Sequence, residues 1–385
     1  MTFGKMQRKR KLILNESILQ FGSGRFLRAF VDLFIHESRL AGENIGKIVI
    51  VQSTGNKRVK IFTQQNYLYH VHVRGIFKEA EVDKLIQVSS VSRALSAQDD
   101  WDSVLAVGRN PSTEYIISNT SEIGYNVPDS EWLNATPPRS FPAKLTRVLW
   151  DRFENGGAPI TIIPCELIDD NAKTLKVIVK TLAKRFNLTD GFLEWLDYEV
   201  SWLNTLVDRI TIDPPTSYNN PRQDDRLITL TEPFAFWAIE DNKGPQALIQ
   251  HPALIRTHDV RSYALRKMRV LNGAHTALVA RALPIGIKTV REAVEHPEIG
   301  PWLRELIFQE LVPALPDDTK DVLSFAENCI ERFRNPYLDH LLTSIAVEHE
   351  TKVQIRLRPT FYAYLKKFKR QPPLLSSIIT INSEL

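Results

Sequence analysis

The feature that most constrains the fold is a short apolar strand followed at once by two closely spaced glycines and an amphipathic helix. The strand is expected over residues 17–21, and the glycines are Gly22 and Gly24. A second strand, over residues 47–52, follows at the spacing of a βαβ unit. In such a unit the G-x-G turn exposes backbone N–H groups at the helix N-terminus, where a pyrophosphate can bind. The sequence therefore predicts a Rossmann-like, dinucleotide-binding sheet.

The pattern departs from the usual dinucleotide signature in two places. Leu27 replaces the third glycine of G-x-G-x-x-G, and the second strand ends in Gln52 without the acidic residue that commonly binds the ribose 2′-hydroxyl. Lys57 and Arg58 follow; they could meet the 2′-phosphate of NADP or simply face solvent. NAD is the cofactor we expect, and the sequence leaves NADP open.

Two further strands, over residues 115–119 and 160–164, end in polar residues. Ligands of doubly wound sheets bind beyond the carboxyl ends of the strands, so these positions are candidates for cofactor contact. The alternative is that they cap turns, as polar residues at strand ends often do. The predicted cofactor-binding residues are Phe21, Gly22, Gly24, Arg25, Phe26, Gln52, Asn119, Thr120 and Glu122.

The second half of the chain has a different character. From about residue 190 the apolar spacing becomes mostly helical, beginning with a long helix expected over residues 191–206. The exceptions are a Pro-rich loop over 211–226 and a stretch over 227–239 that can form strands. The 385 residues suffice for two cores. We therefore predict an α/β protein. Residues 1–190 form a Rossmann-like doubly wound sheet domain, and residues 191–385 form a mostly α-helical domain that carries the catalytic residues.

The second half also holds the pattern K-x4-N-x2-H, formed by Lys267, Asn272 and His275, within a predicted helix over residues 265–283. At about 100° per residue these side chains share one face of an α-helix. An amine, an amide and an imidazole placed together could act on one carbonyl or hydroxyl group. The alternative is a solvated lysine beside a structural histidine.

Composition narrows the class of partner. The net charge of +4 is too small to favour nucleic acid, and the two cysteines, Cys165 and Cys329, suggest neither disulfides nor a zinc cluster. No signal peptide or membrane span is expected, so we place the protein in the cytoplasm. The basic run over residues 5–11 is interpreted as a solvated arm. The expected partner is a small molecule; monomer and homo-oligomer stay open.

Four patterns together resemble the polyol-specific long-chain dehydrogenase family, also called the mannitol dehydrogenase family. They are G-x-G-x-F-x-R-A over 22–29, Thr120-Ser121-Glu122-x-Gly124-Tyr125, Val207-Asp208-Arg209-Ile210, and K-x4-N-x2-H over 267–275. The resemblance implies metal-independent hydride transfer between a nicotinamide cofactor and a secondary alcohol of a sugar-like substrate.

The resemblance also implies roles for individual residues. Lys267 would be the general acid/base, and Asn272 and His275 would hold and polarise the reacting oxygen. Asp208 would lie near the substrate and orient the lysine. Glu122 would lie near the cofactor end of the site.

The chain departs from the mannitol-type members after the strand over 160–164. Those members have Cys-Asp-Asn where this chain has Cys165-Glu166-Leu167, so a substrate contact of the Asn is lost. The change is typical of the branch that acts on D-tagaturonate and D-altronate, and it argues against mannitol or fructuronate as substrate. A sugar acid needs a cationic partner. Among Arg332, Arg334, Lys352 and Arg356, the predicted substrate-binding residues are Lys352, the first choice, and Arg334.

Two other departures concern length. The loop between Ile210 and the Lys267 helix is shorter than in that branch, and the chain ends earlier, which indicates either a compact variant or a missing C-terminal part. Two alternatives to the sugar-acid dehydrogenase stay open: a mannitol- or fructuronate-type dehydrogenase of the same family, and a cofactor-binding protein without catalysis. The latter would need Gly22 and Gly24 but not Lys267, Asn272 and His275 together.

Overall fold

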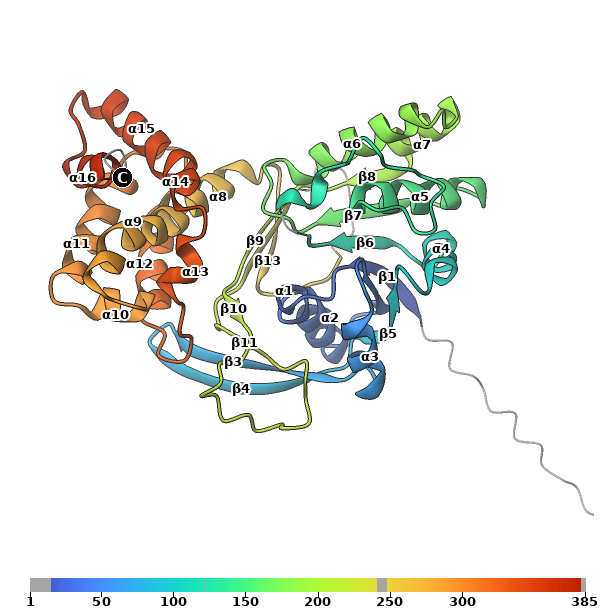
Figure 1. Cartoon of the computed structure of the whole chain (residues 1–385), viewed down its shortest axis with the longest axis horizontal. Helices are drawn as coiled ribbons and strands as arrows, with labels where there is room; N and C mark the ends of the chain where they lie inside the picture. The colour runs from blue at the N-terminus through green and yellow to red at the C-terminus, as the bar shows by residue number, and fades with distance from the viewer. Residues whose placement is uncertain (1–14, 121, 241–247, 382–385) are drawn as a thin grey trace, which may run out of the picture.

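A six-stranded parallel sheet forms the centre of the N-terminal part in the computed structural model, which describes residues 15–120, 122–240 and 248–381 (Figure 1). The spatial order is β5-β2-β1-β6-β7-β8, and every neighbouring pair is parallel. Within this sheet the order is that of dinucleotide-binding folds, so the predicted fold class is confirmed. The strands are β1 (Glu16–Phe21), β2 (Lys47–Gln52), β5 (Val91–Ser96), β6 (Tyr115–Ser118), β7 (Ile160–Pro164) and β8 (Val200–Trp202).

Both faces of this sheet are buried under helices. Because successive side chains of a strand point to opposite faces, each strand contributes residues to two apolar clusters. In β1, Ile18 packs into one apolar cluster, and Leu19 and Phe21 pack into another. The helices of this part are α1 (Arg25–Arg28), α2 (Val31–Leu40), α3 (Lys57–Gln64), α4 (Trp101–Arg109), η1 (Glu122–Tyr125), α5 (Phe141–Glu154), α6 (Asn171–Arg185) and α7 (Asp190–Tyr198). The first three cover the Ile18 face, and α4 to α7 cover the Leu19 face.

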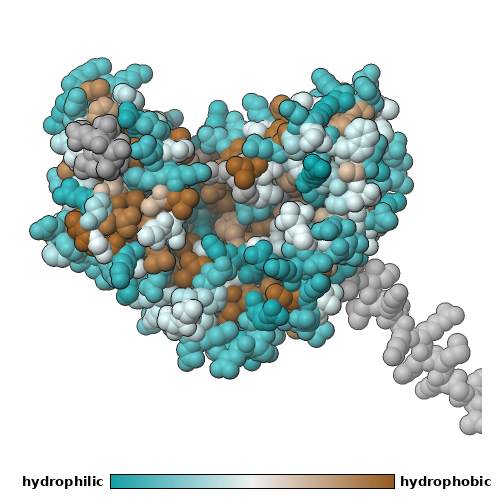
Figure 2. Space-filling model, in the orientation of Figure 1, coloured by the Kyte–Doolittle hydropathy of each residue, from teal (hydrophilic) through white to brown (hydrophobic). Residues whose placement is uncertain are grey.

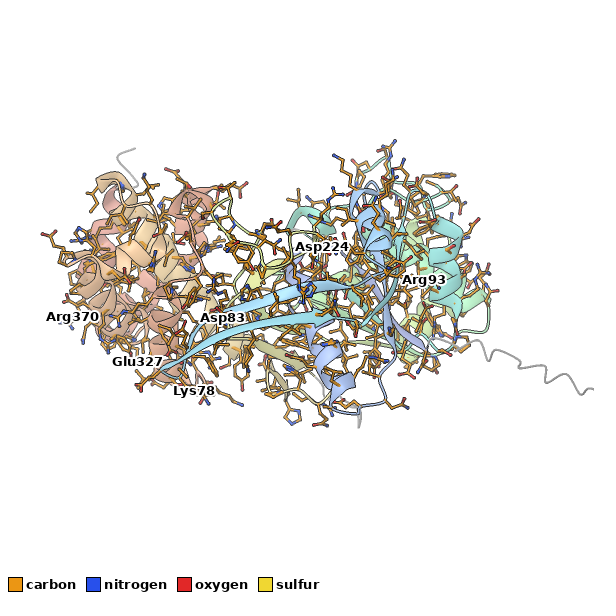
Figure 3. All side chains as sticks on the ribbon, turned by 90° about the horizontal axis from the view of Figure 1, so that it is seen from below. Lys78, Asp83, Arg93, Asp224, Glu327 and Arg370 are labelled. Atoms are coloured by element: carbon orange, nitrogen blue, oxygen red, sulfur yellow. The ribbon has the colours of Figure 1, made fainter. Side chains whose placement is uncertain are left out.

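A long hairpin connects this part to the helical part. Its strands β3 (Tyr69–Phe77) and β4 (Ala80–Val88) are inserted between α3 and β5 and pair with β11 (Thr229–Thr231) and β10 (Thr211–Ile212) in the order β10-β11-β3-β4. Figure 3 shows Lys78, at the hairpin tip, beside the helical part that carries Glu327. At the tip the Glu79 N–H donates to Glu331 Oε1 over 3.1 Å. The hairpin therefore holds the two parts together.

A third sheet leads into the helical part. Its order is β13 (Leu254–Thr257), β12 (Phe236–Glu240) and β9 (Thr205–Asp208). The structure differs here from the division predicted at residue 190, because β8 follows that residue and completes the parallel sheet. The helix expected over residues 191–206 ends at Tyr198, and two short strands follow it. In the structure the change from strands to helices falls between Thr257 and Arg261.

The helical part is built around one nearly enclosed helix, α9 (Gly273–Ala282), of which all but two residues are buried. Thirteen segments make up this part. Besides α9 they are α8 (Arg261–Arg266), η2 (Lys267–Asn272), η3 (Leu283–Ile285), α10 (Val290–Glu295), α11 (Ile299–Leu306), η4 (Ile307–Leu311), α12 (Val322–Phe333), α13 (Leu342–Ala346), α14 (His349–Lys352), η5 (Val353–Leu357), α15 (Arg358–Phe368) and α16 (Pro373–Ile381). No helix among the described residues has the length and apolarity needed to cross a membrane.

Candidate active site

The helix predicted over residues 265–283 forms, but its central turn is not α-helical. The run α8–η2–α9 is continuous, and η2, from Lys267 to Asn272, is a π-helix. In a π-helix the hydrogen bonds join residues five apart, so Lys267 and Asn272 close one turn instead of standing at 100° steps. Short π-helical segments often occur at functional sites, because the wider turn displaces side chains from their α-helical positions.

Lys267 lies in a buried environment that lowers the pKa of its amine. Its Nζ donates to the carbonyl oxygen of Val207 over 2.6 Å and lies 3.6 Å from Asp208 Oδ1. Burial lowers the pKa of Lys267, the negative charge of Asp208 opposes this effect, and the positive charge of Arg332 adds to it. The amine is therefore closer to exchanging a proton near neutral pH than an exposed lysine is.

Arg332 joins two buried carboxylates beside the lysine. Its guanidinium donates to Asp208 over 2.9 and 3.1 Å and to Glu232 over 2.7 and 2.8 Å. Burial favours a raised pKa for Asp208, but Arg332 and Lys267 outweigh burial and lower it. Burial raises the pKa of Glu232. Asp208 is thus the charged partner next to Lys267, and Arg332, considered above for a substrate carboxylate, is fully engaged inside the protein.

The same network reaches the glycine turn. Arg209 donates to the carbonyl oxygens of Glu232 and Ala29, over 2.9 and 2.8 Å. Arg28, which is also buried, donates to the carbonyl oxygen of Ser23 over 2.7 Å. The turn between β1 and α2 and the carboxylates around Arg332 are therefore held by one continuous set of buried hydrogen bonds.

Asn272 and His275 offer hydrogen-bonding groups that the protein itself leaves largely unused. Among the residues that the structure describes, the Asn272 amide has only a weak contact, from Nδ2 to Met268 Sδ over 3.8 Å. His275 Nε2 is buried and has no hydrogen-bond partner within the described part of the chain. Burial, with the positive charge of nearby groups, lowers the pKa of His275 well below 6.5, so its ring is neutral. Both side chains lie on the same continuous helical run as Lys267.

A second set of contacts brings β9, and with it Lys267, to the carboxyl edge of the parallel sheet. Asn171 Nδ2 donates to the Pro164 carbonyl at the end of β7, over 3.1 Å, and Asn171 Oδ1 accepts from the Thr205 N–H over 3.0 Å. Thr205 opens β9, whose Val207 accepts the hydrogen bond of Lys267. This edge is where cofactors of such sheets bind.

The glycine turn has the shape that a pyrophosphate needs. Gly22 has φ of 132°, and a Cβ there would meet Leu27 Cδ1 at 2.9 Å and the Asn119 carbonyl oxygen at 3.1 Å. A Cβ at Gly24, by contrast, would meet nothing within 4 Å. Gly22 is therefore required by the tight turn, and the space beside Gly24 is open at the start of α1.

Several side chains predicted to bind the cofactor contact the protein instead. Phe21 lies in the core against Phe141, with ring centroids 5.4 Å apart, and Phe26 stacks on Phe30 at 4.8 Å. Arg25 is half exposed and pairs with Asp213 over 2.6 Å. Phe21 and Phe26 are packed against other rings of the protein. The half-exposed guanidinium of Arg25, by contrast, is free to turn from Asp213 to a ligand.

The polar candidates at the other strand ends are also engaged. Gln52 Oε1 accepts from the N–H groups of Arg58 and Val59 at the start of α3, which is a helix-capping role. Asn119 Nδ2 donates to the Cys165 carbonyl over 2.6 Å. Glu122 begins η1, and its side chain lies outside the described part of the structure, as do residues 5–11.

Glu166, which was not among the predicted site residues, lies at the junction of two strand ends. Its buried carboxylate accepts from the Thr120 N–H over 2.9 Å, Ser118 Oγ over 3.1 Å and Tyr125 OH over 3.2 Å. Leu167, beside it, is 52% exposed. Glu166 follows β7 and Thr120 follows β6, and the two strands pair in parallel. The expected strand order of a dinucleotide-binding sheet therefore predicts that these two residues are neighbours.

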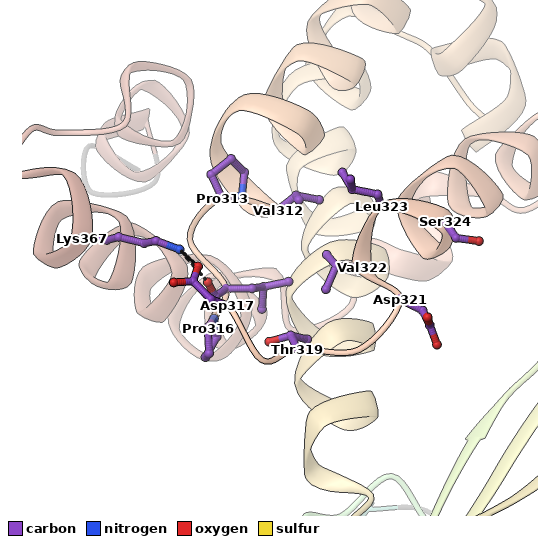
Figure 4. A pocket seen from close by; sticks show the side chains of 11 residues that line it. Val312, Pro313, Pro316, Asp317, Thr319, Asp321, Val322, Leu323, Ser324 and Lys367 are labelled. Carbon is purple, nitrogen blue, oxygen red and sulfur yellow. Dashed lines mark hydrogen bonds and ion pairs between the residues drawn. The ribbon is translucent and has the colours of Figure 1, made fainter.

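The two predicted carboxylate-binding residues lie in different places. Lys352 is half-buried at the end of α14 and donates to the Ile345 carbonyl over 2.9 Å. Arg334 is exposed and lines a hollow of about 570 Å³ with His296 and Arg304, in which none of the other predicted site residues lies. A further hollow of about 380 Å³, where Lys367 pairs with Asp317, is equally separate (Figure 4).

Figure 2 shows a hollow between the helical part and the sheet-based part, with hydrophobic residues along its walls. In Figure 1, α8 and β9 lie between the same two parts, and the run from α8 continues into α9 inside the helical part. Within residues 15–120, 122–240 and 248–381, no group of three or more His, Cys, Asp or Glu side chains is placed to hold a metal ion. The arrangement suits proton transfer by Lys267 to an oxygen that Asn272 and His275 can polarise.

Comparison with known proteins identifies the family of the chain. Residues 16–252 match the mannitol dehydrogenase Rossmann domain, and residues 259–381 match the mannitol dehydrogenase C-terminal domain. An altronate oxidoreductase of Halalkalibacterium halodurans is 34% identical over 387 residues, covering 97% of this chain and 76% of the relative. An altronate oxidoreductase of Bacillus subtilis is 34% identical over 380 residues, covering 94% and 77%.

Solved structures share the fold. A mannitol 2-dehydrogenase of Pseudomonas fluorescens, in a ternary complex with NAD and D-mannitol, superposes with a TM-score of 0.80 at 22% identity, covering 95% of this chain and 78% of that one. A substrate-free D-sorbitol dehydrogenase gives a TM-score of 0.82 at 21% identity, covering 95% and 79%. The family predicted from the sequence motifs is confirmed. The chain therefore belongs to the mannitol dehydrogenase family of oxidoreductases.

Proposed function

We propose that the protein is an NAD-dependent oxidoreductase that interconverts D-tagaturonate and D-altronate. The observation that carries the proposal is the buried Lys267 amine, 3.6 Å from Asp208 and on one helical run with Asn272 and His275. The substrate follows from the altronate oxidoreductases that match nearly the whole chain. Leu167 at the position of the mannitol-type Asn supports the same branch.

The residues around the glycine turn fit a nicotinamide dinucleotide. The space beside Gly24 is open, which leaves room for a pyrophosphate. Gly24 is the N-cap of α1, and the first N–H groups of a helix have no partner within the helix. Arg25 is close enough in sequence to add a positive charge once it leaves Asp213. The cofactor, when bound, supplies the hydride for reduction or receives it in oxidation.

Lys267 exchanges the proton that accompanies hydride transfer. In reduction its ammonium group donates a proton to the carbonyl oxygen of the substrate; in oxidation the neutral amine takes the proton of the hydroxyl group. Asn272 Nδ2 and a ring N–H of His275 donate hydrogen bonds to the same oxygen and stabilise its developing charge. Asp208, held by Arg332, orients the amine. A cation and two donors supply this polarisation without a metal ion.

Lys352 is the proposed partner of the substrate carboxylate. Lys352 ends α14 directly before η5, which packs against both η2 and α9. Its position in the chain next to the helical run of Lys267 supports this choice. Arg334 is the second choice, because it lines a separate hollow.

A panel of substrates and cofactors tests the proposal. With NADH, D-tagaturonate should be reduced with a kcat/KM at least about tenfold above that of D-fructose, which lacks a carboxylate, since a charged hydrogen bond to the carboxylate contributes about 1.5–3 kcal/mol. D-fructuronate, which carries the carboxylate but differs in its hydroxyl groups, should also be a poorer substrate than D-tagaturonate. NADPH should be the poorer cofactor. A preference for fructose would indicate a mannitol-type enzyme, and a preference for fructuronate would indicate the neighbouring sugar-acid enzyme. No oxidation of either cofactor with any substrate would indicate a binding protein without catalysis.

A further inference from the structure

A second histidine lies against His275, on a segment that the prediction of site residues did not include. The His340 ring meets the His275 ring edge-on, at 77°, with centroids 5.0 Å apart. Phe333, at the end of α12, also packs against His275, with ring centroids 4.5 Å apart. The two imidazoles therefore form one contiguous polar surface beside an aromatic ring.

Both histidines carry a buried nitrogen that the protein does not use. His275 Nε2 and His340 Nδ1 are buried and have no hydrogen-bond partner among the described residues. Leaving a buried polar atom unpaired costs about 1–3 kcal/mol, so two such atoms on neighbouring rings point to a ligand that supplies the missing hydrogen bonds.

The charge state of the rings restricts what that ligand can be. Burial, helped by the positive charge of Arg332, lowers the pKa of His340 to about 4, and the pKa of His275 is lowered as well. At neutral pH both rings are uncharged, so each offers one N–H donor and one acceptor nitrogen. A carboxylate prefers charged donors, whereas a hydroxyl group can either donate to a neutral imidazole or accept from it.

The backbone fixes the position of His340. Its N–H donates to the Leu338 carbonyl over 2.8 Å, and its own carbonyl accepts from the Val290 N–H at the start of α10 over 3.0 Å. The Leu342 N–H donates to the Lys288 carbonyl over 2.9 Å. The ring is thus attached to the body of the helical part and not to a free loop.

We propose that His340 is a substrate-binding residue: while His275 donates to the oxygen that Lys267 serves, His340 Nδ1 holds a hydroxyl group on the neighbouring substrate carbon. The inference rests on the proposed function, since a polyhydroxylated substrate must occupy the site. It adds a specificity-determining contact, because the enzyme then recognises a hydroxyl group of the substrate as well as its carboxylate.

Two variants test the inference. His340→Phe keeps a ring of similar size without nitrogen, and His340→Asn places an amide near the position of Nδ1. With D-tagaturonate and NADH, His340→Phe should lower kcat/KM roughly tenfold, mainly through KM, because it removes one hydrogen bond and leaves its partner unpaired. His340→Asn should recover most of the loss. Affinity for NADH, measured by its fluorescence, and the thermal unfolding midpoint should match those of the unaltered protein.

Deoxy analogues separate binding from a structural role. Among mono-deoxy derivatives of tagaturonate, one should lose kcat/KM with the unaltered enzyme but show no further loss with His340→Phe. The inference is overturned if His340→Phe stays within twofold of the unaltered enzyme, if His340→Asn is as deficient as His340→Phe, or if every analogue shows the full His340→Phe penalty. An unaltered protein inactive with every substrate overturns the proposed function as well, whereas an active one with an unaffected variant overturns only this inference.

Discussion

Replacing Lys267 with methionine should lower kcat for D-tagaturonate reduction by about 10²–10⁴-fold and leave NADH affinity unchanged, because general acid–base groups contribute about this factor. Methionine keeps an unbranched apolar stem in the space of the lysine side chain. Asp208 keeps both hydrogen bonds to Arg332 when the amine is lost, so the surrounding structure should persist. Steady-state rates and NADH fluorescence titration give the two quantities.

The matched control is Lys366→Met, the same substitution at an exposed position on α15. It should leave kcat unchanged. A Lys267→Met enzyme that keeps kcat within tenfold of the unaltered protein, with Lys366→Met behaving as expected, would remove Lys267 from the proton transfer.

Replacing Arg332 with methionine should lower the free energy of unfolding by about 3–5 kcal/mol, the range seen when one partner of a buried ion pair is removed. The loss follows from what remains: Asp208 and Glu232 are both buried, and each accepts two hydrogen bonds from this guanidinium. Without it, two carboxylates are left without their shared cation. Denaturant unfolding of both proteins gives the difference.

An exposed pair provides the comparison. Arg304 and Glu327 form a two-bonded ion pair of similar geometry, at 2.8 and 3.0 Å, but both side chains are 54% exposed. Arg304→Met should cost less than about 1 kcal/mol. Adding Glu232→Gln to Arg332→Met should recover part of the loss, since one buried charge disappears. Equal destabilisation by Arg332→Met and Arg304→Met would mean that the buried network is not structural.

The parts of the fold that follow from local pattern could be predicted from the sequence. The strand before Gly22, the strand over residues 47–52 and the helical run around Lys267 each depend on residues close together in the chain. The three-residue strand β8 could not, because its only support is pairing with β7, some 40 residues earlier. The helix expected over residues 191–206 was therefore too long, because it included β8 and the start of β9.

The candidate site divides in the same way. Lys267, Asn272 and His275 lie within nine residues, so their association is visible in the sequence, although the π-helical turn that displaces them is not. Arg332 is hydrogen-bonded to Asp208 and to Glu232, which are 124 and 100 residues away in the sequence. Local sequence patterns do not indicate such distant pairs. His340 is likewise brought to His275 only by the packing of the helical part.

The pH dependence of kcat/KM in both directions tests the central claim most directly. Reduction needs the Lys267 ammonium group, so its rate should be full below the pKa of this group and fall as the pH rises through it. Oxidation needs the neutral amine and should rise through the same pKa, which burial places below the 10.5 of an ordinary lysine. We predict two opposed profiles that share one pKa and disappear together in Lys267→Met. Profiles without a shared pKa, or a Lys267→Met enzyme that keeps them, would contradict the assignment of the proton to Lys267.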